Sequence, residues 1–204
     1  SNTLLDCGLK KGQFSINVSN RKIIQGLIND LNIPEEKQLK VIRAIDKLDK
    51  PGFGLKGVED LLKKERKDSS GAVTKGANLN DEQASKILNF LKIKDLKELK
   101  NNLKNQLSQE GIKELEDFFE ILGYGSNLGQ VKTNFTIVRG LAYYSDFIVE
   151  TNLNFKVTNT KGKTVDIGSI CSGGTYAKLI SRFKGVDIPG TGISFGIDRL
   201  LFAL

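Results

Sequence analysis

The pattern of hydrophobic and polar residues divides the chain into a strand, a long helical stretch and a second, strand-rich stretch. Residues 13–18 alternate between polar and apolar side chains, which is the period of a half-buried strand. Ser19-Asn20 can cap a helix that continues to about Leu31, and Pro34 stands where a helix favours its first residue. From Pro34 to Gly123 apolar residues recur at helical spacing.

The helical stretch contains several predicted helices, each with one apolar face. The apolar faces of four of these helices are Val41, Ile42, Ile45 and Leu48; Ala84, Ile87, Leu88 and Leu91; Leu96, Leu99, Leu103 and Leu107; and Leu115, Phe118, Phe119 and Leu122. A further short helix is predicted over residues 55–67. Pro51-Gly52-Phe53-Gly54 breaks the first helix, and Ser69 to Asn78 predicts a mobile loop. Asn80 followed by Gln83 predicts a helix cap.

After residue 130 the chain becomes rich in β-branched and aromatic residues. The predicted strands are Thr133–Val138, Asp146–Thr151, Thr164–Cys171 and Thr191–Ile197, and a helix should start near Asp198. Their short spacing favours an antiparallel sheet. The pattern therefore predicts an α+β fold in which an all-α subdomain, residues 33–128, separates two core segments, residues 1–32 and 129–204.

Composition is that of an ordinary globular protein, with 39% hydrophobic and 27% charged residues among 204. No apolar run reaches the ~20 residues of a membrane span, and the N-terminus lacks the layout of a signal peptide. The chain contains no Met. We therefore expect it to be a segment of a longer protein, with Ser1-Asn2 as a remnant of tag cleavage.

Cysteine and histidine content restricts the chemistry. Cys7 and Cys171 are the two cysteines, and His is absent. This set cannot form an ordinary structural zinc site, and it excludes Ser-His, Cys-His and histidine acid–base catalysis within the chain. We interpret both cysteines as reduced thiols that pack as small apolar residues. Catalysis by this chain would have to use Arg, Tyr, carboxylates or backbone groups.

The net charge of +7 is unevenly distributed. Residues 35–125 hold 18 Lys and Arg against 17 Asp and Glu, so the helical stretch is nearly neutral. Most of its charges are typical of solvated helix faces. The run Lys63-Lys64-Glu65-Arg66-Lys67 is a candidate contact for phosphate groups.

Three short motifs follow predicted strands and carry candidate chemistry. They are Arg139-Gly140-Leu141-Ala142-Tyr143-Tyr144, Gly173-Gly174-Thr175-Tyr176, and the segment from Gly192 to Leu201 that contains Gly196, Asp198 and Arg199. Arginine pairs with phosphates and carboxylates, tyrosine supplies an apolar wall with a polar tip, and glycine permits close approach of a ligand to the backbone. Taken singly, each motif could equally be a sheet corner or a turn, and Asp198 a helix N-terminal acid.

In this order the three motifs resemble the end of the catalytic core of the histidyl-tRNA synthetase family. The first resembles the histidine-specific motif Arg-Gly-Leu-Asp-Tyr-Tyr, the second the family's Gly-Gly-Arg-Tyr-Asp, and the third class II motif 3. Asn20-Arg21-Lys22, Ile45 to Lys50 and the helical run to Leu122 resemble the family as well. The resemblance implies the antiparallel sheet portion of a class II synthetase core with an all-α insertion subdomain.

The resemblance also implies an activity and a set of roles. Histidine and ATP, with Mg²⁺, would give histidyl-adenylate, and the histidyl group would pass to tRNA(His), in a cytoplasmic homodimer. Arg139 would be catalytic, contacting the α-phosphate and the histidine carboxylate. The histidine pocket would comprise Tyr143, Tyr144, Gly173, Gly174 and Tyr176. Gly196 would floor the adenine site, and Arg199 would bind ATP.

The match has departures that leave two alternatives open. Ala142 and Ala177 replace the usual aspartates, Thr175 replaces an arginine, and motifs 1 and 2 and the anticodon-binding domain are absent from the sequence. We attribute the absent parts to truncation and expect this chain alone to be inactive. One alternative is a non-catalytic relative, such as the histidine-sensing regulatory subunit of ATP phosphoribosyltransferase. The other is a helical RNA-binding module, which would explain the lysines but not the motifs.

Overall fold

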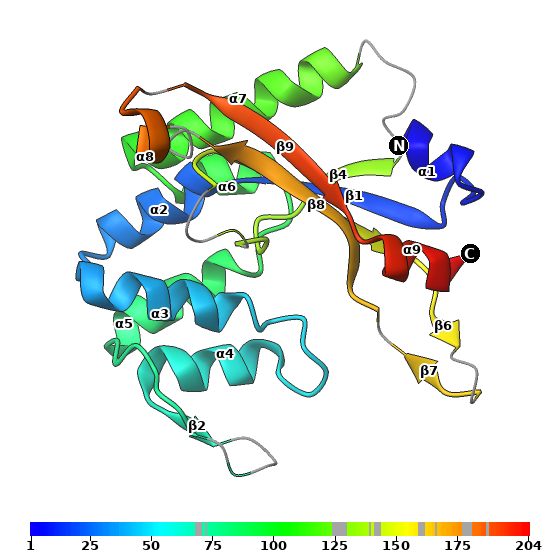
Figure 1. Ribbon diagram of the computed structural model, residues 1–204. Coiled ribbons are helices and arrows are strands. Elements are labelled where there is room, and N and C mark those ends of the chain that lie inside the picture. The colour runs from blue at the N-terminus through cyan, green and yellow to red at the C-terminus, as the bar shows by residue number, and fades with distance from the viewer. Residues whose placement is uncertain are drawn as a thin grey trace.

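A mixed five-stranded sheet runs through the centre of the molecule, with strands taken from both ends of the chain (Figure 1). This computed structural model describes residues 1–67, 71, 73–123, 130–138, 140, 144–158, 162–165, 167–176, 181–186 and 188–204. The strands, in spatial order, are β4 (Val131–Thr133), β1 (Phe14–Asn20), β5 (Phe147–Leu153), β8 (Ser169–Tyr176) and β9 (Gly190–Phe195).

Three of the four strand pairings are antiparallel, as predicted, and the fourth is not. β1–β5, β5–β8 and β8–β9 are antiparallel, whereas β1 and β4 are parallel, with Ile16 opposite Val131 and Val18 opposite Thr133. A parallel pair needs a long crossover connection. The helical stretch between β1 and β4 supplies it, so the helices are inserted between two adjacent strands of one sheet.

Helices and two short hairpins complete the described structure. The helices are α1 (Asn2–Asp6), α2 (Arg21–Asp30), α3 (Glu35–Ile45), α4 (Gly54–Lys63), α5 (Asp81–Phe90), α6 (Leu96–Asn102), α7 (Gln106–Gly123), α8 (Ser181–Lys184) and α9 (Ile197–Ala203). The hairpins pair β2 (Arg66–Lys67) with β3 (Val73–Thr74), and β6 (Val157–Thr158) with β7 (Thr164–Val165). In the part of the chain described, no helix combines the length and apolar character that crossing a membrane requires.

The predicted helix caps are confirmed. The Asn20 side chain accepts a hydrogen bond from the Lys22 amide at the start of α2. At α5, Asn80 and Gln83 form a reciprocal capping box, with the Asn80 side chain accepting from the Gln83 amide at 2.8 Å. Such caps satisfy backbone N–H groups that have no partner inside the helix.

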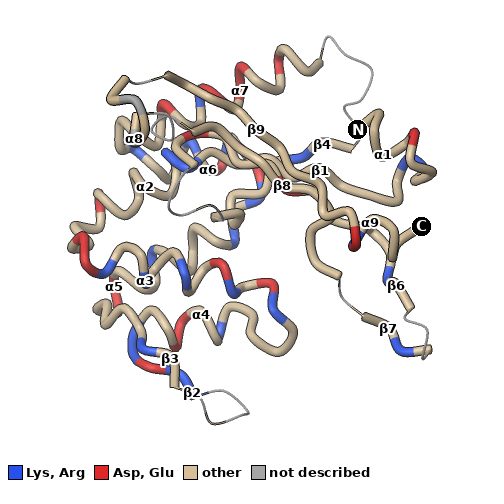
Figure 2. Tube along the Cα trace, in the orientation of Figure 1, with Lys and Arg blue, Asp and Glu red and all other residues tan. Residues whose placement is uncertain are grey.

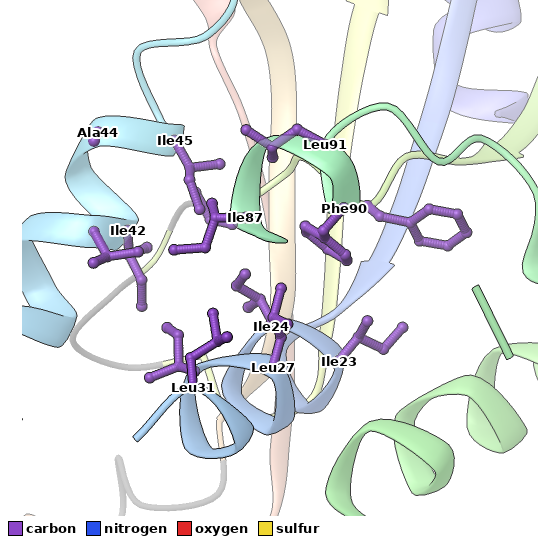
Figure 3. Packing of buried hydrophobic residues seen from close by; sticks show 14 of the residues in the cluster. Ile23, Ile24, Leu27, Leu31, Ile42, Ala44, Ile45, Ile87, Phe90 and Leu91 are labelled. Carbon is purple, nitrogen blue, oxygen red and sulfur yellow. The ribbon is translucent and has the colours of Figure 1, made fainter. Parts of the chain in front are cut away.

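One large hydrophobic core joins the helices to the sheet. Figure 3 shows side chains of α2 meeting those of α3 and α5, with Ile24 and Leu27 facing Ile42, Ile45 and Ile87. The same core includes Val18 of β1. A second, smaller core comprises Leu4, Leu9, Phe14, Ile170 and Leu200, and it packs α1 and α9 together against the sheet.

Two predicted helical segments had wrong boundaries. The apolar series Leu96, Leu99, Leu103 and Leu107 does not form one helix, because α6 ends at Asn102 and Leu103 is extended. The Asn105 side chain accepts from the Leu107 amide at 3.0 Å, so a new helix, α7, begins there. The helix predicted over 55–67 ends at Lys63, and β2 and β3 occupy part of the stretch predicted as its end and a mobile loop.

Two predicted strands were also placed inaccurately, and α1 was not predicted. β4 ends at Thr133, because the Asn134 side chain accepts from the Thr136 amide and turns the chain. The strand predicted over 164–171 is two strands, β7 and β8. Gly168, which has a φ of 66°, lies between them.

Candidate active site

The second and third motifs lie on adjacent antiparallel strands, next to the strand that follows the first. Gly174 of β8 lies opposite Ile148 of β5 on one side and Gly192 of β9 on the other. Tyr144 of the first motif is three residues before β5. Folding therefore brings together motifs that are separated in the sequence by about 30 residues (first and second) and about 15 residues (second and third). Arg139, Leu141, Ala142, Tyr143 and Ala177 lie outside the described residues.

Tyr144 and Tyr176 form an aromatic pair at one end of this surface. Their ring centroids are 5.2 Å apart, with the ring planes inclined at 45°. Tyr144 is buried with Ile137 and Ile148, and Tyr176 packs against this cluster while remaining half-buried. The Tyr144 amide donates to the Gly140 carbonyl at 3.0 Å. The pair can therefore form an apolar wall for a flat ligand.

Two of the motif glycines make room for the Tyr144 ring. A Cβ at Gly140 would lie 1.8 Å from Cδ2 of Tyr144, and φ at Gly140 is 73°. A Cβ at Gly174 would lie 2.7 Å from Cδ1 of the same ring. Both contacts are shorter than real Cβ atoms permit. The Tyr144 ring therefore lies close to the backbone at Gly140 and Gly174, where any residue with a Cβ would collide with it.

Gly173 has a different role from Gly174. A Cβ at Gly173 would lie 2.3 Å from the Gly192 carbonyl oxygen and 2.8 Å from Ile193 Cα. Gly173 therefore permits close packing of β9 on β8. Both glycines are buried, Gly173 beneath β9 and Gly174 beneath the Tyr144 ring.

The third motif runs along β9, so that Gly192 lies beside Tyr176 whereas Gly196 and Arg199 lie at the far end of β8 from the tyrosine pair. The Gly196 amide donates to the Ile170 carbonyl at 2.9 Å, and Gly196 caps α9. The Arg199 guanidinium donates through Nη1 to the Ser169 carbonyl at 2.7 Å. Ser169 and Gly174 are five residues apart along the strand, roughly 16 Å at the rise of a β-strand. The tyrosine pair and the Arg199 guanidinium therefore lie near opposite ends of β8.

A polar band, comprising the buried Asn17 and Glu150 and the half-buried Asn152, was not predicted from the sequence. Asn17 Nδ2 donates to Asn152 Oδ1 at 3.0 Å, and Asn152 Nδ2 donates to Glu150 Oε1 at 3.4 Å. Asn17 and Glu150 are 5% and 6% exposed. Because alternate residues of a strand share a face, Glu150 lies on the same face as Ile148, which contacts Tyr144. The alternation of polar residues in β1 was the available signal, whereas the polar residues of β5, Glu150 to Asn152, are consecutive.

A cavity of about 460 Å³ opens beside this polar band. Asn17 is one of its lining residues, with Ile93 and Lys94 from the helical stretch and Lys132 and Thr136 from β4 and the turn after it. The cavity therefore lies where the inserted helices meet the sheet.

Both cysteines are free thiols, as interpreted, but the expected packing as a small apolar residue holds for Cys171 and not for Cys7. Neither is in a disulfide; Cys7 is exposed and Cys171 is buried. Burial raises the pKa of the Cys171 thiol, so that this group is protonated near neutral pH. A protonated thiol is a poor nucleophile, which favours a packing role for Cys171.

Comparisons with known proteins give consistent matches over nearly the whole chain. The family model described as histidyl-tRNA synthetase matches residues 2–200. A histidine–tRNA ligase of Pelagibacter ubique (strain HTCC1062) is 77% identical over 204 residues, which are 100% of this chain and 44% of that protein. A histidine–tRNA ligase of Rhizobium rhizogenes (strain K84 / ATCC BAA-868) is 41% identical over 216 residues, covering all of this chain and 42% of the relative.

Solved structures show the same fold. Histidyl-tRNA synthetase from Nostoc sp. PCC 7120 superposes with a TM-score of 0.73 at 31% identity, over 98% of this chain and 46% of that one. A Bacillus halodurans protein described as an ATP phosphoribosyltransferase regulatory subunit/histidyl-tRNA synthetase gives the same TM-score at 21% identity, covering all of this chain and 47% of that one. The latter likeness concerns the fold alone. The chain spans less than half the length of these relatives.

Proposed function

The chain belongs to the histidyl-tRNA synthetase family, and on that premise we propose that its parent protein is a histidine–tRNA ligase. By parent protein we mean the native gene product that contains residues 1–204, whatever its full length. It would activate histidine with ATP to histidyl-adenylate and transfer the histidyl group to tRNA(His). The described fold, a mixed sheet with helices, is that of the class II synthetases in this family. Histidine-dependent pyrophosphate exchange in the parent protein tests the proposal.

The observation that carries the proposal is the arrangement of the three motifs, the first just before β5, the second on β8 and the third on β9 and the start of α9. In the proposed site Arg139 is catalytic, and the histidine pocket comprises Tyr143, Tyr144, Gly173, Gly174 and Tyr176. The pairing of the Tyr144 and Tyr176 rings supports a wall for the imidazole ring of histidine. Gly196 and Arg199 would bind ATP at the other end of β8. The intervening polar band supports an elongated polar ligand that spans both ends.

Mg²⁺ is part of the proposal as a companion of ATP. No group of three or more His, Cys, Asp and Glu that could hold a metal occurs among the described residues. Mg²⁺ commonly binds through one or two carboxylates together with substrate phosphates. Glu150, the buried carboxylate of the polar band, fits that requirement, and Mg²⁺ would supply neutralisation of the phosphate charge.

We further propose that the parent protein is a cytoplasmic homodimer. Within this chain, residues 1–32 and 129–204 would form parts of the catalytic core, and residues 33–128 would form the helical insertion. Large apolar side chains are exposed on β9 and α9, and β9 is an edge strand. These residues are Ile193, Ile197, Leu201 and Phe202. An apolar edge of this kind supports burial against further protein.

The regulatory-subunit alternative receives less support. It shares the fold, and the departures Ala142, Thr175 and Ala177 remain compatible with it. However, the relatives that are 77% and 41% identical are named as histidine–tRNA ligases. Arg139 and Arg199, the two cations to which the resemblance gives roles in the ligase reaction, are both present.

Arg199→Ala should act mainly through ATP. The guanidinium is held at the Ser169 carbonyl, at the end of β8 remote from the tyrosine pair. We therefore expect the KM for ATP to rise or kcat/KM for ATP to fall, with little change in the KM for histidine. Pyrophosphate exchange at varied ATP and varied histidine measures both. A larger effect on histidine than on ATP would contradict this placement.

Charge reversal of Lys63, Lys64, Arg66 and Lys67 should weaken tRNA binding and reduce its salt dependence, by about 0.9 in slope for each phosphate that is no longer neutralised. Amino-acid activation should stay near normal. Binding at several salt concentrations measures the slope, and Lys113, which pairs with Asp117 on α7, offers a control. Unchanged tRNA affinity would leave the run as a solvated face.

The residues of this basic run differ in their surroundings, so we expect them to contribute unequally to tRNA binding. Lys63 lies 2.8 Å from Asp81 and 3.1 Å from Glu59, so it is already paired. Lys67 instead lines a cavity of about 460 Å³ together with Lys47 and Lys50. Figure 2 shows basic and acidic residues interspersed along α3 and α4. We therefore expect Lys67 to contribute more to the tRNA effect than Lys63.

The 204-residue chain by itself should show no measurable adenylate synthesis and weak or undetectable binding of histidine and ATP. In this family the active site is built from three class II signature motifs. The 204-residue sequence contains motif 3 and the histidine-specific motif, but it does not contain motifs 1 and 2. The binding energies of contacts within one site are not additive, so a site that has lost half of its contacts loses far more than half of its affinity. Calorimetric titration with histidine and with ATP–Mg²⁺ measures this. Micromolar binding with turnover would show that the chain is self-sufficient.

A further inference from the structure

Three segments that are distant in sequence meet at the end of β1. Asn20, the last residue of β1, donates through Nδ2 to Glu114 Oε2 of α7 at 2.6 Å. The Lys22 ammonium group, on the first turn of α2, binds Glu114 and also lies 3.4 Å from Asp146 Oδ1. One cation therefore joins a helix of the inserted stretch to the segment that precedes β5.

The joint is closely packed. A Cβ at Gly111 of α7 would lie 2.9 Å from Lys22 Cβ and 3.1 Å from Asn20 Oδ1, so a glycine lets the helix approach the end of β1. The side chains of Lys22, Glu114 and Asp146 are 23%, 35% and 26% exposed. The hydrogen bond from Lys22 to Glu114 raises the pKa of Lys22, which keeps the ammonium charged near neutral pH. Partial burial reduces the screening of these charges by salt.

The same joint leads directly to the candidate histidine pocket. The Asp146 carbonyl accepts from the Arg21 amide at 2.8 Å, and its Oδ2 accepts from the Ser145 hydroxyl at 2.6 Å. The Ser145 amide donates to the Thr175 carbonyl at 2.9 Å, between Gly174 and Tyr176. Tyr144, whose ring contacts Tyr176, immediately precedes Ser145. Fixing Asp146 therefore restricts the backbone that orients the Tyr144 ring.

We propose that Lys22 is a positioning residue that couples α7 of the helical insertion to the orientation of Tyr144 in the histidine pocket. This inference rests on the proposed function for its catalytic readout. One ammonium bridges two carboxylates on separate elements, so a displacement of α7 disturbs the anchor of Asp146. A change in the position of the helical insertion would therefore affect the binding of histidine more than the binding of ATP, because the proposed ATP site lies at the far end of β8.

The test compares Lys22→Met, Lys22→Arg and Lys113→Met in the parent protein. Methionine keeps much of the length of lysine and removes the charge. Lys113 bonds Asp117 within α7, on a single helix, so its replacement removes an ion pair that does not bridge two elements. Lys22→Met should raise the KM for histidine about tenfold, the size of a lost charge-assisted hydrogen bond of a partly exposed group. The KM for ATP should change less than about twofold, and Lys22→Arg should restore most of the histidine KM.

Amide hydrogen exchange gives a readout that does not depend on activity. Lys22→Met should speed exchange at Ser145, whose amide is bonded to Thr175, by about tenfold, and leave the centre of β5 unchanged. If Lys22→Met prevents folding, Asp146→Asn, which keeps the size of the side chain, should produce the same exchange effect and the same rise in histidine KM. Equal losses for histidine and ATP, or unchanged exchange at Ser145, would overturn the inference. Absence of pyrophosphate exchange in the unaltered protein would contradict the proposed function alone, and the amide exchange would still decide the role of Lys22.

Discussion

Replacing Arg139 by alanine in the parent protein should slow histidine-dependent pyrophosphate exchange by about 30- to 900-fold. This range corresponds to the loss of about 2–4 kcal/mol of transition-state stabilisation, the usual size of one preorganised charged contact. The resemblance places Arg139 against the α-phosphate and the histidine carboxylate, where charge shifts during adenylate formation. The loss should therefore appear in kcat and in kcat/KM together.

Two further variants make this prediction sharper. Arg139→Lys keeps the charge but loses the planar, bidentate donor geometry, so it should recover only part of the rate. Lys10→Ala removes a cation from an exposed position outside the three motifs and should leave the rate unchanged. A change below about threefold for Arg139→Ala would remove Arg139 from the catalytic role.

The second large effect is expected for Gly140→Ala, with Gly162→Ala as its control. Both glycines have a φ of 73°, where an alanine costs about 1–2 kcal/mol of backbone strain. They differ in their surroundings, because a Cβ at Gly140 would lie 1.8 Å from the Tyr144 ring and a Cβ at Gly162 would meet nothing within 4 Å. Gly140→Ala should therefore cost about 1–3 kcal/mol more in unfolding free energy than Gly162→Ala.

The same substitution should also damage the pocket. The new methyl group must displace the Tyr144 ring, so the KM for histidine should rise about tenfold or more, while Gly162→Ala should leave it unchanged. Thermal unfolding and pyrophosphate exchange measure the two effects. If the clash is the cause, Gly140→Ala should cost less in a Tyr144→Ala background, since the double change removes the conflict. Equal costs in both backgrounds would show that the ring is not responsible.

The sequence predicted features whose causes are local. The caps at Asn20 and Asn80 depend on residues two or three positions away, and both are present in the structure. The boundary between α6 and α7 was missed, because Leu103 and Leu107 have helical spacing whether or not the helix continues between them. The break at Gly168 was likewise hidden inside a run of β-forming residues.

For the candidate site, contiguous motifs were visible and assembled features were not. Tyr144, Tyr176 and Arg199 could be named because each lies in a short recognisable segment. The polar band depends on strand register, which brings Asn17 opposite Glu150. Register is set by the whole sheet, so periodicity within a single strand could not show which polar residues would be neighbours.

The sheet order has a consequence for how the protein is made. Among the strands of the described sheet β1 is synthesised first, yet both of its neighbours, β4 and β5, come more than 100 residues later. On the ribosome β1 must therefore wait unpaired while α2 to α7 emerge, and these helices can begin to bury their apolar faces against one another before the sheet exists. Contacts between distant residues form slowly because a long loop must close first. Because Val18 of β1 belongs to the core formed by these helices, we expect the helices to hold β1 near the place where β4 and β5 pair with it, and so to shorten the search that completes the sheet.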